Sequence, residues 1–187
     1  MSKESKPAAE GQLSATLRLA QLEDVDFLHE LIDNAYRKFQ PGAWTTEASL
    51  VSGERVSCTI LEEYITQNVE PIHVAVLNID SVDVIVGCIQ TSRTDNDEGM
   101  LGLFSVMPQF QSRGIGTTLI MHAMEYLRRT WSCTRAVMWV IESREELLKW
   151  YFNLGFVDSG MKMDFALPDQ AKSQFQFVVI KKDLATM

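Results

Sequence analysis

The stretch from Leu103 to Gly116 restricts the possible folds of this chain most, because it links a strand to a helix through a loop that ends in two glycines. The run Leu103–Val106 is β-prone, Pro108 follows it, and Gly114 and Gly116 stand where a helical pattern begins. The first turn of a helix carries unpaired N–H groups and the positive end of the helix dipole, and glycines let a bulky anion approach that backbone. The segment is a candidate pyrophosphate-binding turn, with a purely structural turn as the alternative.

Two other phosphate-binding loops do not fit these letters. A dinucleotide-binding fingerprint requires a third glycine or alanine, where this chain has Leu119, and a turn directly after its strand. A nucleoside-triphosphate loop requires Lys and then Ser or Thr after its last glycine, but Thr117 and Thr118 follow Gly116. Neither class of nucleotide site is expected.

A strand and two helices are expected in the first part of the chain. A short strand at Thr16–Leu19 comes first, and a second helix is expected around Thr59–Gln67. Apolar side chains between them repeat at three- and four-residue steps, at Val25, Leu28, Ile32, Ala35 and Phe39. This spacing predicts an amphipathic helix, which Pro41 and Gly42 end.

Short β-prone runs predict three consecutive antiparallel strands in the middle of the chain. They lie at His73–Leu77, Val84–Thr91 and Met100–Val106, and turn-rich residues at Asp80–Ser81 and Asp95–Asp97 separate them.

Helices and strands alternate in the remaining third of the chain. A helix is expected from about Gly114 to Arg129, and the nearly continuous apolar run Ala136–Ile141 suits a strand covered on both faces. Ser143 and Glu146 match a capping box that would open another helix, which Gly155 ends. The last strands are expected near Phe156 and at Phe175–Lys181.

The order of these elements predicts an α+β fold with a single mixed, mainly antiparallel sheet flanked by helices. The 187 residues fit one domain, which we place at residues 15–187. Residues 1–14 are polar and small with a proline, and they are expected to form a flexible tail.

Charge and composition exclude several classes of function. A net charge of -8 argues against nucleic acid and anionic membranes as main partners, since both need a concentrated basic surface. No apolar run reaches the ~20 residues of a membrane span or resembles a signal peptide, so the cytoplasm is expected, with the nucleus as an open alternative. Cys58, Cys88 and Cys133 fit neither a disulfide framework nor a metal motif, and the three histidines form no ligand cluster. No metal site is expected.

The loop resembles the pyrophosphate motif of the GNAT superfamily of N-acetyltransferases, Gln/Arg-x-x-Gly-x-Gly/Ala. It reads Gln111-Ser112-Arg113-Gly114-Ile115-Gly116 and matches at every fixed position. The resemblance extends to a preceding Val-x-Pro, at Val106 and Pro108, and to a later Tyr-x-x-x-Gly-Phe that begins at Tyr151. These motifs occupy Leu103–Phe156, whereas the similarity in element order covers Thr16–Leu184.

The resemblance implies the acyl-CoA N-acyltransferase fold and acetyl-CoA as cofactor. In this family the strand before the motif is bulged and splays from its neighbour, and the pantetheine arm lies in the gap. The resemblance implies cofactor contacts at Phe104, Ser105, Val106, Gln111, Ser112, Arg113, Gly114, Ile115, Gly116 and Thr117. A main-chain N–H near Val106 would stabilise the oxyanion.

Tyr151 matches the family tyrosine whose hydroxyl points at the cofactor sulfur and can donate a proton to the leaving thiolate. The alternative for Tyr151 is an aromatic side chain that only packs in the core. Many members carry an asparagine seven residues earlier, where this chain has Arg144, and the acidic base of some members corresponds to Trp139. No catalytic base is therefore transferred, and Glu142 is either a proton relay through water or a solvated carboxylate.

The acceptor pocket of the superfamily lies mainly between the first two helices, which makes Tyr36, Trp44, Thr46 and Glu47 candidates by location. The segment Ala43–Ala48, with Arg144, Trp150 and Tyr151, also resembles a subgroup whose substrates are mostly unassigned. Acids and aromatic faces attract ammonium groups, so Glu47 beside Trp44 is expected to bind the acceptor amine. Packing and capping of the loop are the alternative roles of these two residues.

The expected activity is transfer of the acetyl group of acetyl-CoA to a primary amine of a small molecule or a protein, by a monomer or homodimer. Small α-amino compounds and N-termini rank above lysines, because their reference pKa of about 7.7 to 8.0 lies nearer neutrality than the value of about 10.4 for lysine. The alternative is a catalytically inactive GNAT-like module that binds or senses acyl-CoA.

Overall fold

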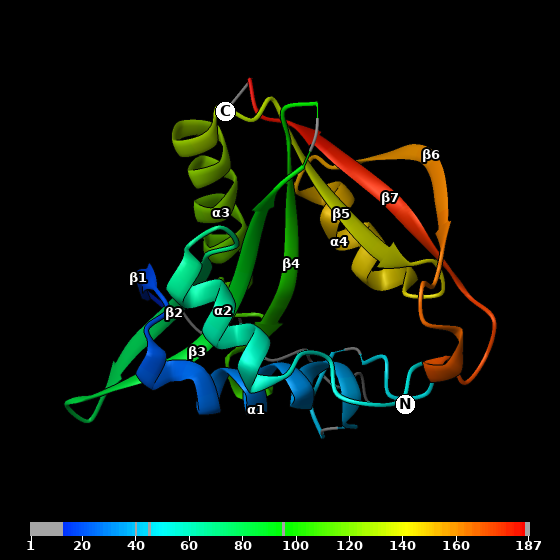
Figure 1. The fold of residues 1–187 in the computed structure, drawn as a ribbon. Helices are drawn as coiled ribbons and strands as arrows, with labels where there is room; N and C mark the ends of the chain where they lie inside the picture. The colour runs from blue at the N-terminus through cyan, green and yellow to red at the C-terminus, as the bar shows by residue number, and fades with distance from the viewer. Residues whose placement is uncertain (1–12, 40, 45, 95, 186–187) are drawn as a thin grey trace, which may run out of the picture.

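The computed structural model describes residues 13–39, 41–44, 46–94 and 96–185. Most of the expected tail, residues 1–12, and also Thr45 and Asp95 lie outside these described residues. The elements are β1 (Thr16–Leu19), η1 (Leu22–Asp24), α1 (Val25–Arg37), α2 (Cys58–Gln67), β2 (Ile72–Ile79), β3 (Val82–Arg93), β4 (Glu98–Val106), η2 (Pro108–Phe110), α3 (Ile115–Trp131), β5 (Arg135–Ile141), α4 (Glu145–Asn153), β6 (Val157–Asp164), η3 (Pro168–Gln170) and β7 (Gln176–Asp183) (Figure 1). No helix in the described part of the chain is long and apolar enough to span a membrane.

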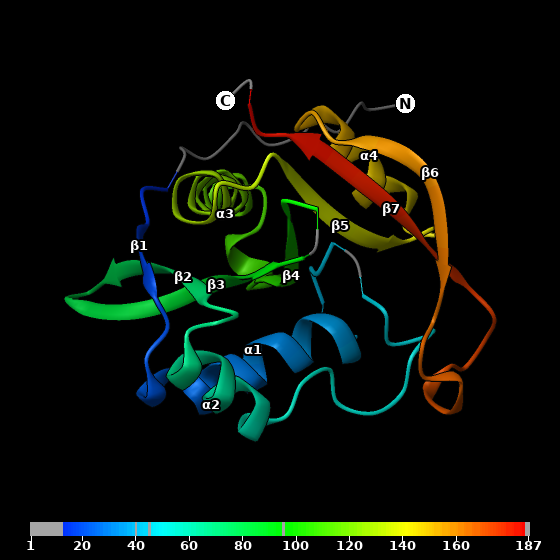
Figure 2. The same cartoon turned by 45° about the horizontal axis from the view of Figure 1, so that its top comes forward.

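The strands form one seven-stranded sheet in the order β1-β2-β3-β4-β5-β7-β6. Only the β4–β5 pair is parallel, and the other neighbouring pairs are antiparallel. Helices cover both faces, with α1 and α2 on one side of the β2–β4 half and α3 on the other (Figure 2). The expected α+β fold with a mixed, mainly antiparallel sheet is confirmed.

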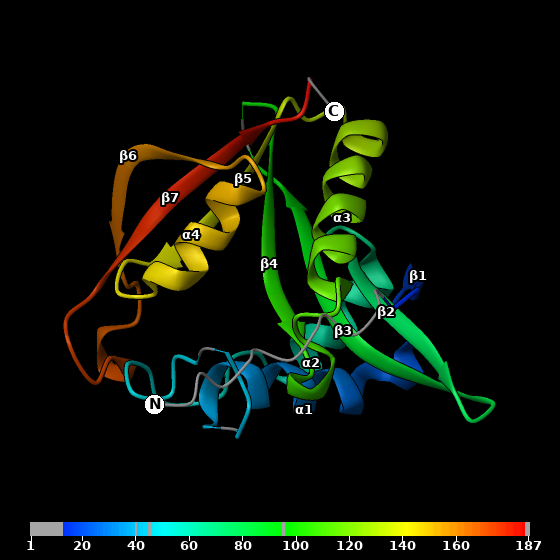
Figure 3. The same ribbon diagram turned by 180° about the vertical axis from the view of Figure 1, so that it is seen from behind.

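Strands β4 and β5 fork in the middle of this sheet. They pair only between Glu98–Met100 and Arg135–Val137, although both strands continue further, and their ends diverge in Figures 1 and 3. The register between β3 and β4 shifts so that β4 holds one extra residue between Gly102 and Ser105, and Leu103 has a φ of 43°. An extra residue bends a strand and ends regular pairing. The bulge and the splayed strands implied by the family resemblance are both present.

Each face of the sheet has its own apolar core. Leu28 and Ile32 of α1 and Leu61 of α2 pack against β2 and β3 on one face. On the other face α3 and α4 share a second core, to which Leu119 and Leu148 belong. Val25, Leu28 and Ile32 of α1 are buried as the helical spacing predicts.

Helix α1 is shorter than the sequence pattern predicted. The helix ends at Arg37, and Phe39, expected on its buried stripe, is 85% exposed. The chain turns back here, so that Glu47 N donates to Tyr36 O and Thr46 Oγ1 donates to Lys38 O. These tertiary bonds satisfy carbonyls at the C-terminus of α1 and end the helix before Phe39.

The capping box expected at Ser143 and Glu146 is wrong. Helix α4 begins at Glu145 with Arg144 in the N-cap position, and no side chain caps it. The Glu146 carboxylate instead accepts a hydrogen bond from Trp44 Nε1 at 3.1 Å. A distant tertiary partner has replaced the local contact that the pattern predicts.

The expectation that both faces of β5 are covered is also wrong at one position. Ala136, Met138 and Val140 pack into the core that α4 shares, whereas Trp139 on the opposite face is 44% exposed. Its ring lies 6.5 Å from that of Phe177 on β7. Trp139 forms part of a cavity wall, which explains why an apolar run is not fully buried here.

Candidate active site

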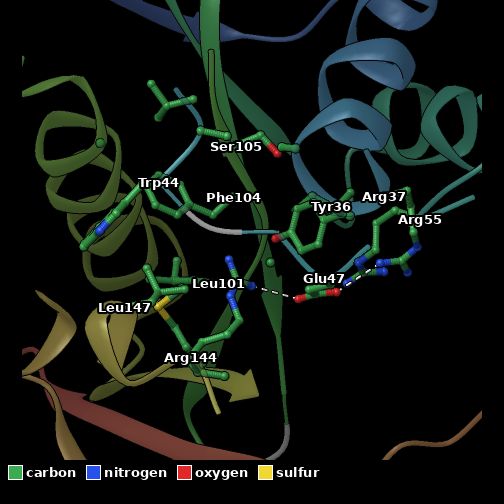
Figure 4. A pocket seen from close by; sticks show the side chains of 18 of the residues that line it. Tyr36, Arg37, Trp44, Glu47, Arg55, Leu101, Phe104, Ser105, Arg144 and Leu147 are labelled. Carbon is green, nitrogen blue, oxygen red and sulfur yellow. Dashed lines mark hydrogen bonds and ion pairs between the residues drawn. The ribbon is translucent and has the colours of Figure 1, made fainter. Parts of the chain in front are cut away.

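A cavity of about 890 Å³ opens at the fork of β4 and β5. Its walls come from α1 and the connection after it, the bulged end of β4, the first turn of α3, β5, α4 and the β6–β7 connection. Figure 4 shows side chains from several of these elements around the cavity. One cavity therefore joins the glycine-containing turn to the segment expected to hold the acceptor.

The turn before α3 leaves its backbone open to the cavity. Gly114 occupies the N-cap position with a φ of 89°, Ser112 has a φ of 60°, and no side chain caps the helix. Gly114, Gly116 and Thr117 line the cavity. The unpaired N–H groups and positive dipole of the first turn make this end of the cavity suitable for an anion.

Gln111 joins this turn to two other walls of the cavity. Its side-chain Nε2 donates to Val106 O at 2.9 Å, and its Oε1 accepts from Trp44 N at 3.0 Å. The resemblance implied a cofactor contact for Gln111. In the structure Gln111 also fixes the end of β4 and the loop that carries Trp44.

Most of the residues expected to bind cofactor lie on this cavity. The expected residues on its wall are Phe104, Ser105, Val106, Gln111, Ser112, Gly114, Gly116 and Thr117. Arg113 and Ile115 are not on the wall, and the Ile115 side chain is fully buried in the α3 core. Their expected contacts involve main-chain groups, which the side-chain positions leave untested.

Four aromatic side chains pack together near the fork. The rings of Phe104 and Trp150 are stacked, with centroids 5.9 Å apart and planes at 6°. Trp44 meets Trp150 edge-on at 6.1 Å, and Tyr151 lies 5.0 Å from Trp150. Trp44 and Phe104 are labelled in Figure 4. Because these residues come from three separate elements, the sequence pattern did not predict their contact.

Tyr151 is positioned by α4 and faces the cavity. The residue is 2% exposed, lines the cavity, and packs against Phe156 at 5.8 Å between ring centroids. Burial raises the pKa of its hydroxyl above the ordinary value, and nearby Tyr36 raises it further. The phenol carries its proton at neutral pH, and the raised pKa makes the phenolate costly to form.

Glu47 lies between two arginines that the sequence pattern did not connect with it. Its Oε2 is 3.0 Å from Arg37 Nη1, and its Oε1 is 2.9 Å from Arg144 Nη1 (Figure 4). The three side chains are 9 to 16% exposed. Arg37 was not identified from the sequence. Its partner Glu47 lies ten residues later, beyond the end of α1, and no local pattern links the two residues.

The other two acceptor candidates have different positions. Tyr36 lines the cavity, and the guanidinium of Arg55 lies 5.2 Å from the centre of its ring. Thr46 does not line the cavity; its hydroxyl donates to Lys38 O and accepts from Ala48 N. The contacts of Thr46 hold the loop in place.

Glu142 is paired rather than free to relay a proton. Its Oε2 lies 2.6 Å from Lys162 Nζ, and this hydrogen bond holds the pKa of Glu142 below its ordinary value. Glu142 is not on the cavity wall. The pairing agrees with the simpler of the two expected roles, a surface carboxylate.

The β6–β7 connection closes the cavity from the side opposite α3. It pairs with the chain after α1 through an antiparallel bridge between Val51 and Ala171, and Ser52 N donates to Gln170 O at 2.8 Å. The connection brings Phe165 and Leu167 to the cavity wall. The sequence pattern gave no signal for this contact between segments about 120 residues apart.

The model of the acetyltransferase (GNAT) family matches residues 28–156 of this chain. This match includes the glycine-containing turn and Tyr151. No curated protein is significantly similar to the chain in sequence.

Solved structures share the fold. YncA of Salmonella typhimurium, solved with its cofactor acetyl-CoA, has 16% identity and a TM-score of 0.68, with 92% of this chain and 95% of that chain covered. A variant of the spermidine N-acetyltransferase SpeG from Vibrio cholerae has 17% identity and a TM-score of 0.66, over 92% and 95%. The ribosomal-protein-S18-alanine N-acetyltransferase of Escherichia coli has 14% identity and a TM-score of 0.64, over 91% and 94%. At these identities the similarity establishes the fold and not the substrate.

Proposed function

This chain belongs to the acetyltransferase (GNAT) family, and we propose that it transfers the acetyl group of acetyl-CoA to a primary amine. The observation that carries the proposal is that the first turn of α3 and the β4–β5 fork open onto one cavity. An anion site at one end and a gap between strands at the other suit a long cofactor with a pyrophosphate.

The residues on the wall fit acetyl-CoA chemically. Backbone groups of the turn from Ser112 to Thr117 would hold the pyrophosphate, and Phe104, Ser105 and Val106 would line the pantetheine arm. The Ser105 hydroxyl is buried without a hydrogen-bond partner among the described groups. When bound, acetyl-CoA supplies an acetyl group activated as a thioester.

The remaining roles belong to the chain's own groups. A main-chain N–H near Val106 would stabilise negative charge on the acyl oxygen. Tyr151 would hold a proton at its hydroxyl and donate it to the departing sulfur. The acceptor amine would enter from the side formed by α1, the connection after it and the β6–β7 connection.

We expect acetyl-CoA to raise the melting temperature of the protein. A ligand that binds only the folded state at about 100 times its Kd adds about 2.7 kcal/mol to the free energy of unfolding. For a chain of this size, that corresponds to a rise of about 5 to 11 °C. Thermal melting with acetyl-CoA, and with NAD as the control, measures the effect.

The activity itself is tested by thiol release from acetyl-CoA across a broad panel of amines. Release with at least one amine supports the proposed transfer. Binding of acetyl-CoA without release from any amine would instead support an inactive binding module. Stabilisation by NAD and not by acetyl-CoA would contradict the cofactor assignment.

Tyr151→Phe is expected to lower kcat by about 100-fold and to leave the Kd for acetyl-CoA nearly unchanged. The substitution removes the proton donor and keeps the ring that packs against Phe156. General acid catalysis contributes about 10²- to 10⁴-fold. A thiol with a reference pKa of about 8.5 needs less help to leave than an amine does, so we expect the low end of this range. Single-turnover rates measure the chemical step. Tyr126→Phe, at a tyrosine off the cavity wall, is the control; equal rates for the two variants would exclude a catalytic role for Tyr151.

A further inference from the structure

Three arginines and four carboxylates line the cavity, and the buried charges among them are two guanidinium groups and one carboxylate. Arg37, Arg55 and Arg144 all line the acceptor side, whereas Glu47 is the buried carboxylate on the same wall. Tyr36 lies beside them (Figure 4). The buried cluster of Arg37, Glu47 and Arg144 therefore presents a local excess of positive charge, which favours an anion near it.

The two arginines make Glu47 a poor site for an ammonium group. Each of its oxygens is already paired with a guanidinium, at 2.9 and 3.0 Å. A substrate cation would have to displace one arginine or enter a site that already holds two nearby positive charges. Both routes cost free energy in a largely buried position. The expected contact between Glu47 and the acceptor amine is therefore disfavoured.

Arg55 is the arginine best placed to meet a substrate. Its side chain is exposed at the cavity wall and lies 5.2 Å from the Tyr36 ring centre, a contact that limits its orientation. No carboxylate among the described residues forms an ion pair with it. A guanidinium offers a planar set of N–H donors that matches a carboxylate or a phosphate.

Each of two exposed acids on the cavity wall has a partner other than Arg55. Glu54 is 3.2 Å from His29 Nε2, and Asp164 accepts a hydrogen bond from Gln176 at 2.9 Å. Glu30 lies on the exposed side of α1. Solvent screens these exposed acids as it screens Arg55, whereas the Arg37–Glu47–Arg144 cluster is largely buried and is screened less.

Much of the wall contributed by β5, the β6–β7 connection and β7 is apolar. Trp139, Phe165 and Phe177 lie on it, with ring centroids 6.2 Å apart for Phe165 and Phe177. Leu167 adds an exposed aliphatic surface. A substrate that fills this side would bury an apolar group there.

We propose that the acceptor carries an anionic group close to its amine and an apolar side chain, as an apolar α-amino acid does. Arg55 binds the anionic group, and the Arg37–Glu47–Arg144 cluster adds positive potential behind it. The proposal rests on the acetyl transfer proposed above and names the substrate class of that site.

Matched pairs of amines test the proposal. Leucine is compared with 3-methylbutylamine, phenylalanine with 2-phenylethylamine, and phosphoethanolamine with ethanolamine. The anionic group alters the pKa of the neighbouring amine. The value of kcat/KM is therefore calculated from the concentration of unprotonated amine, which titration of each compound gives. We expect at least about a tenfold preference for the anionic member, the effect typical of one charge-assisted hydrogen bond.

Arg55→Gln is expected to remove most of this preference by raising the KM of the anionic member. Arg129→Gln, at an exposed arginine off the cavity wall, removes the same charge and should leave the preference intact. A preference seen in the phosphate pair alone would assign the anionic group as a phosphate, and one seen in the amino-acid pairs as a carboxylate.

Equal or faster acetylation of the amines that lack the anionic group would overturn the proposal. A preference that Arg55→Gln leaves intact would also overturn it. Failure of the proposed acetyl transfer is distinguishable, because it would abolish thiol release with every amine. Calorimetric binding of leucine against 3-methylbutylamine, in the presence of coenzyme A, tests the anionic preference independently of turnover.

Discussion

Glu47→Gln is expected to lower the free energy of unfolding by about 3 kcal/mol. Removing one partner of a buried ion pair costs about 3 to 5 kcal/mol, because the remaining charge is left uncompensated, and we expect the low end at a site 10% exposed. The amide of the variant offers a single acceptor oxygen, so Arg37 and Arg144 cannot both keep their bond. For a chain of this length the melting temperature should fall by about 6 to 12 °C.

Glu145→Gln is the matched control for this prediction. Glu145 is 77% exposed and lies 3.9 Å from Lys149, a surface pair of the kind that contributes about 0 to 1 kcal/mol. The two variants change the net charge equally, so a difference in melting temperature reports the buried cluster. Unchanged melting of Glu47→Gln with a raised acceptor KM would instead restore direct binding of the acceptor by Glu47.

The parts of the fold that could be predicted are those encoded by neighbouring residues. The turn before α3 was predictable because Gly114 and Gly116 and the strand before them lie within fourteen residues. The same holds for the three antiparallel strands, whose turns separate them clearly. Local patterns suffice wherever backbone conformation decides the structure.

The parts that could not be predicted depend on contacts between distant segments. Glu47 and Arg144 are 97 residues apart, and only the folded chain shows that they pair. Glu146 fitted a capping box locally, but Trp44 bonds its carboxylate from 102 residues away. Phe39 fitted a helical stripe, but bonds from the returning loop end α1 first. For Glu146 and Phe39 a tertiary contact outweighs the local preference, which for a helix cap is worth about 1 kcal/mol.

The net charge of the chain does not describe the charge at the acceptor site. The net charge of -8 suggested a cationic acceptor, whereas the cavity is lined by three arginines as well as four carboxylates. Net charge describes the whole surface, and many of the acids lie outside the cavity. The electrostatic potential in a binding site depends mainly on the few charged groups that line it.

Gly116→Glu is expected to weaken acetyl-CoA binding by about 1,000-fold, since two like charges about 4 Å apart repel by about 4 kcal/mol at a partly exposed site. Gly116 lies in the first turn of α3 and lines the cavity, so a carboxylate there would face the position proposed for the pyrophosphate. The variant should show no rise in melting temperature at acetyl-CoA concentrations that stabilise the natural protein.

Two further variants at the same position separate charge from size. A Cβ at Gly116 would lie 3.2 Å from the Phe104 ring and 3.5 Å from Trp150, so Gly116→Ala measures the cost of that tight contact alone. Gly116→Gln adds the bulk of glutamate without its charge, and the Kd ratio between the Glu and Gln variants isolates repulsion of the phosphates. We expect that ratio to exceed about tenfold and to shrink at high salt, because screening weakens interactions between exposed charges. A Glu variant that folds and binds acetyl-CoA as the natural protein does would show that the pyrophosphate lies elsewhere.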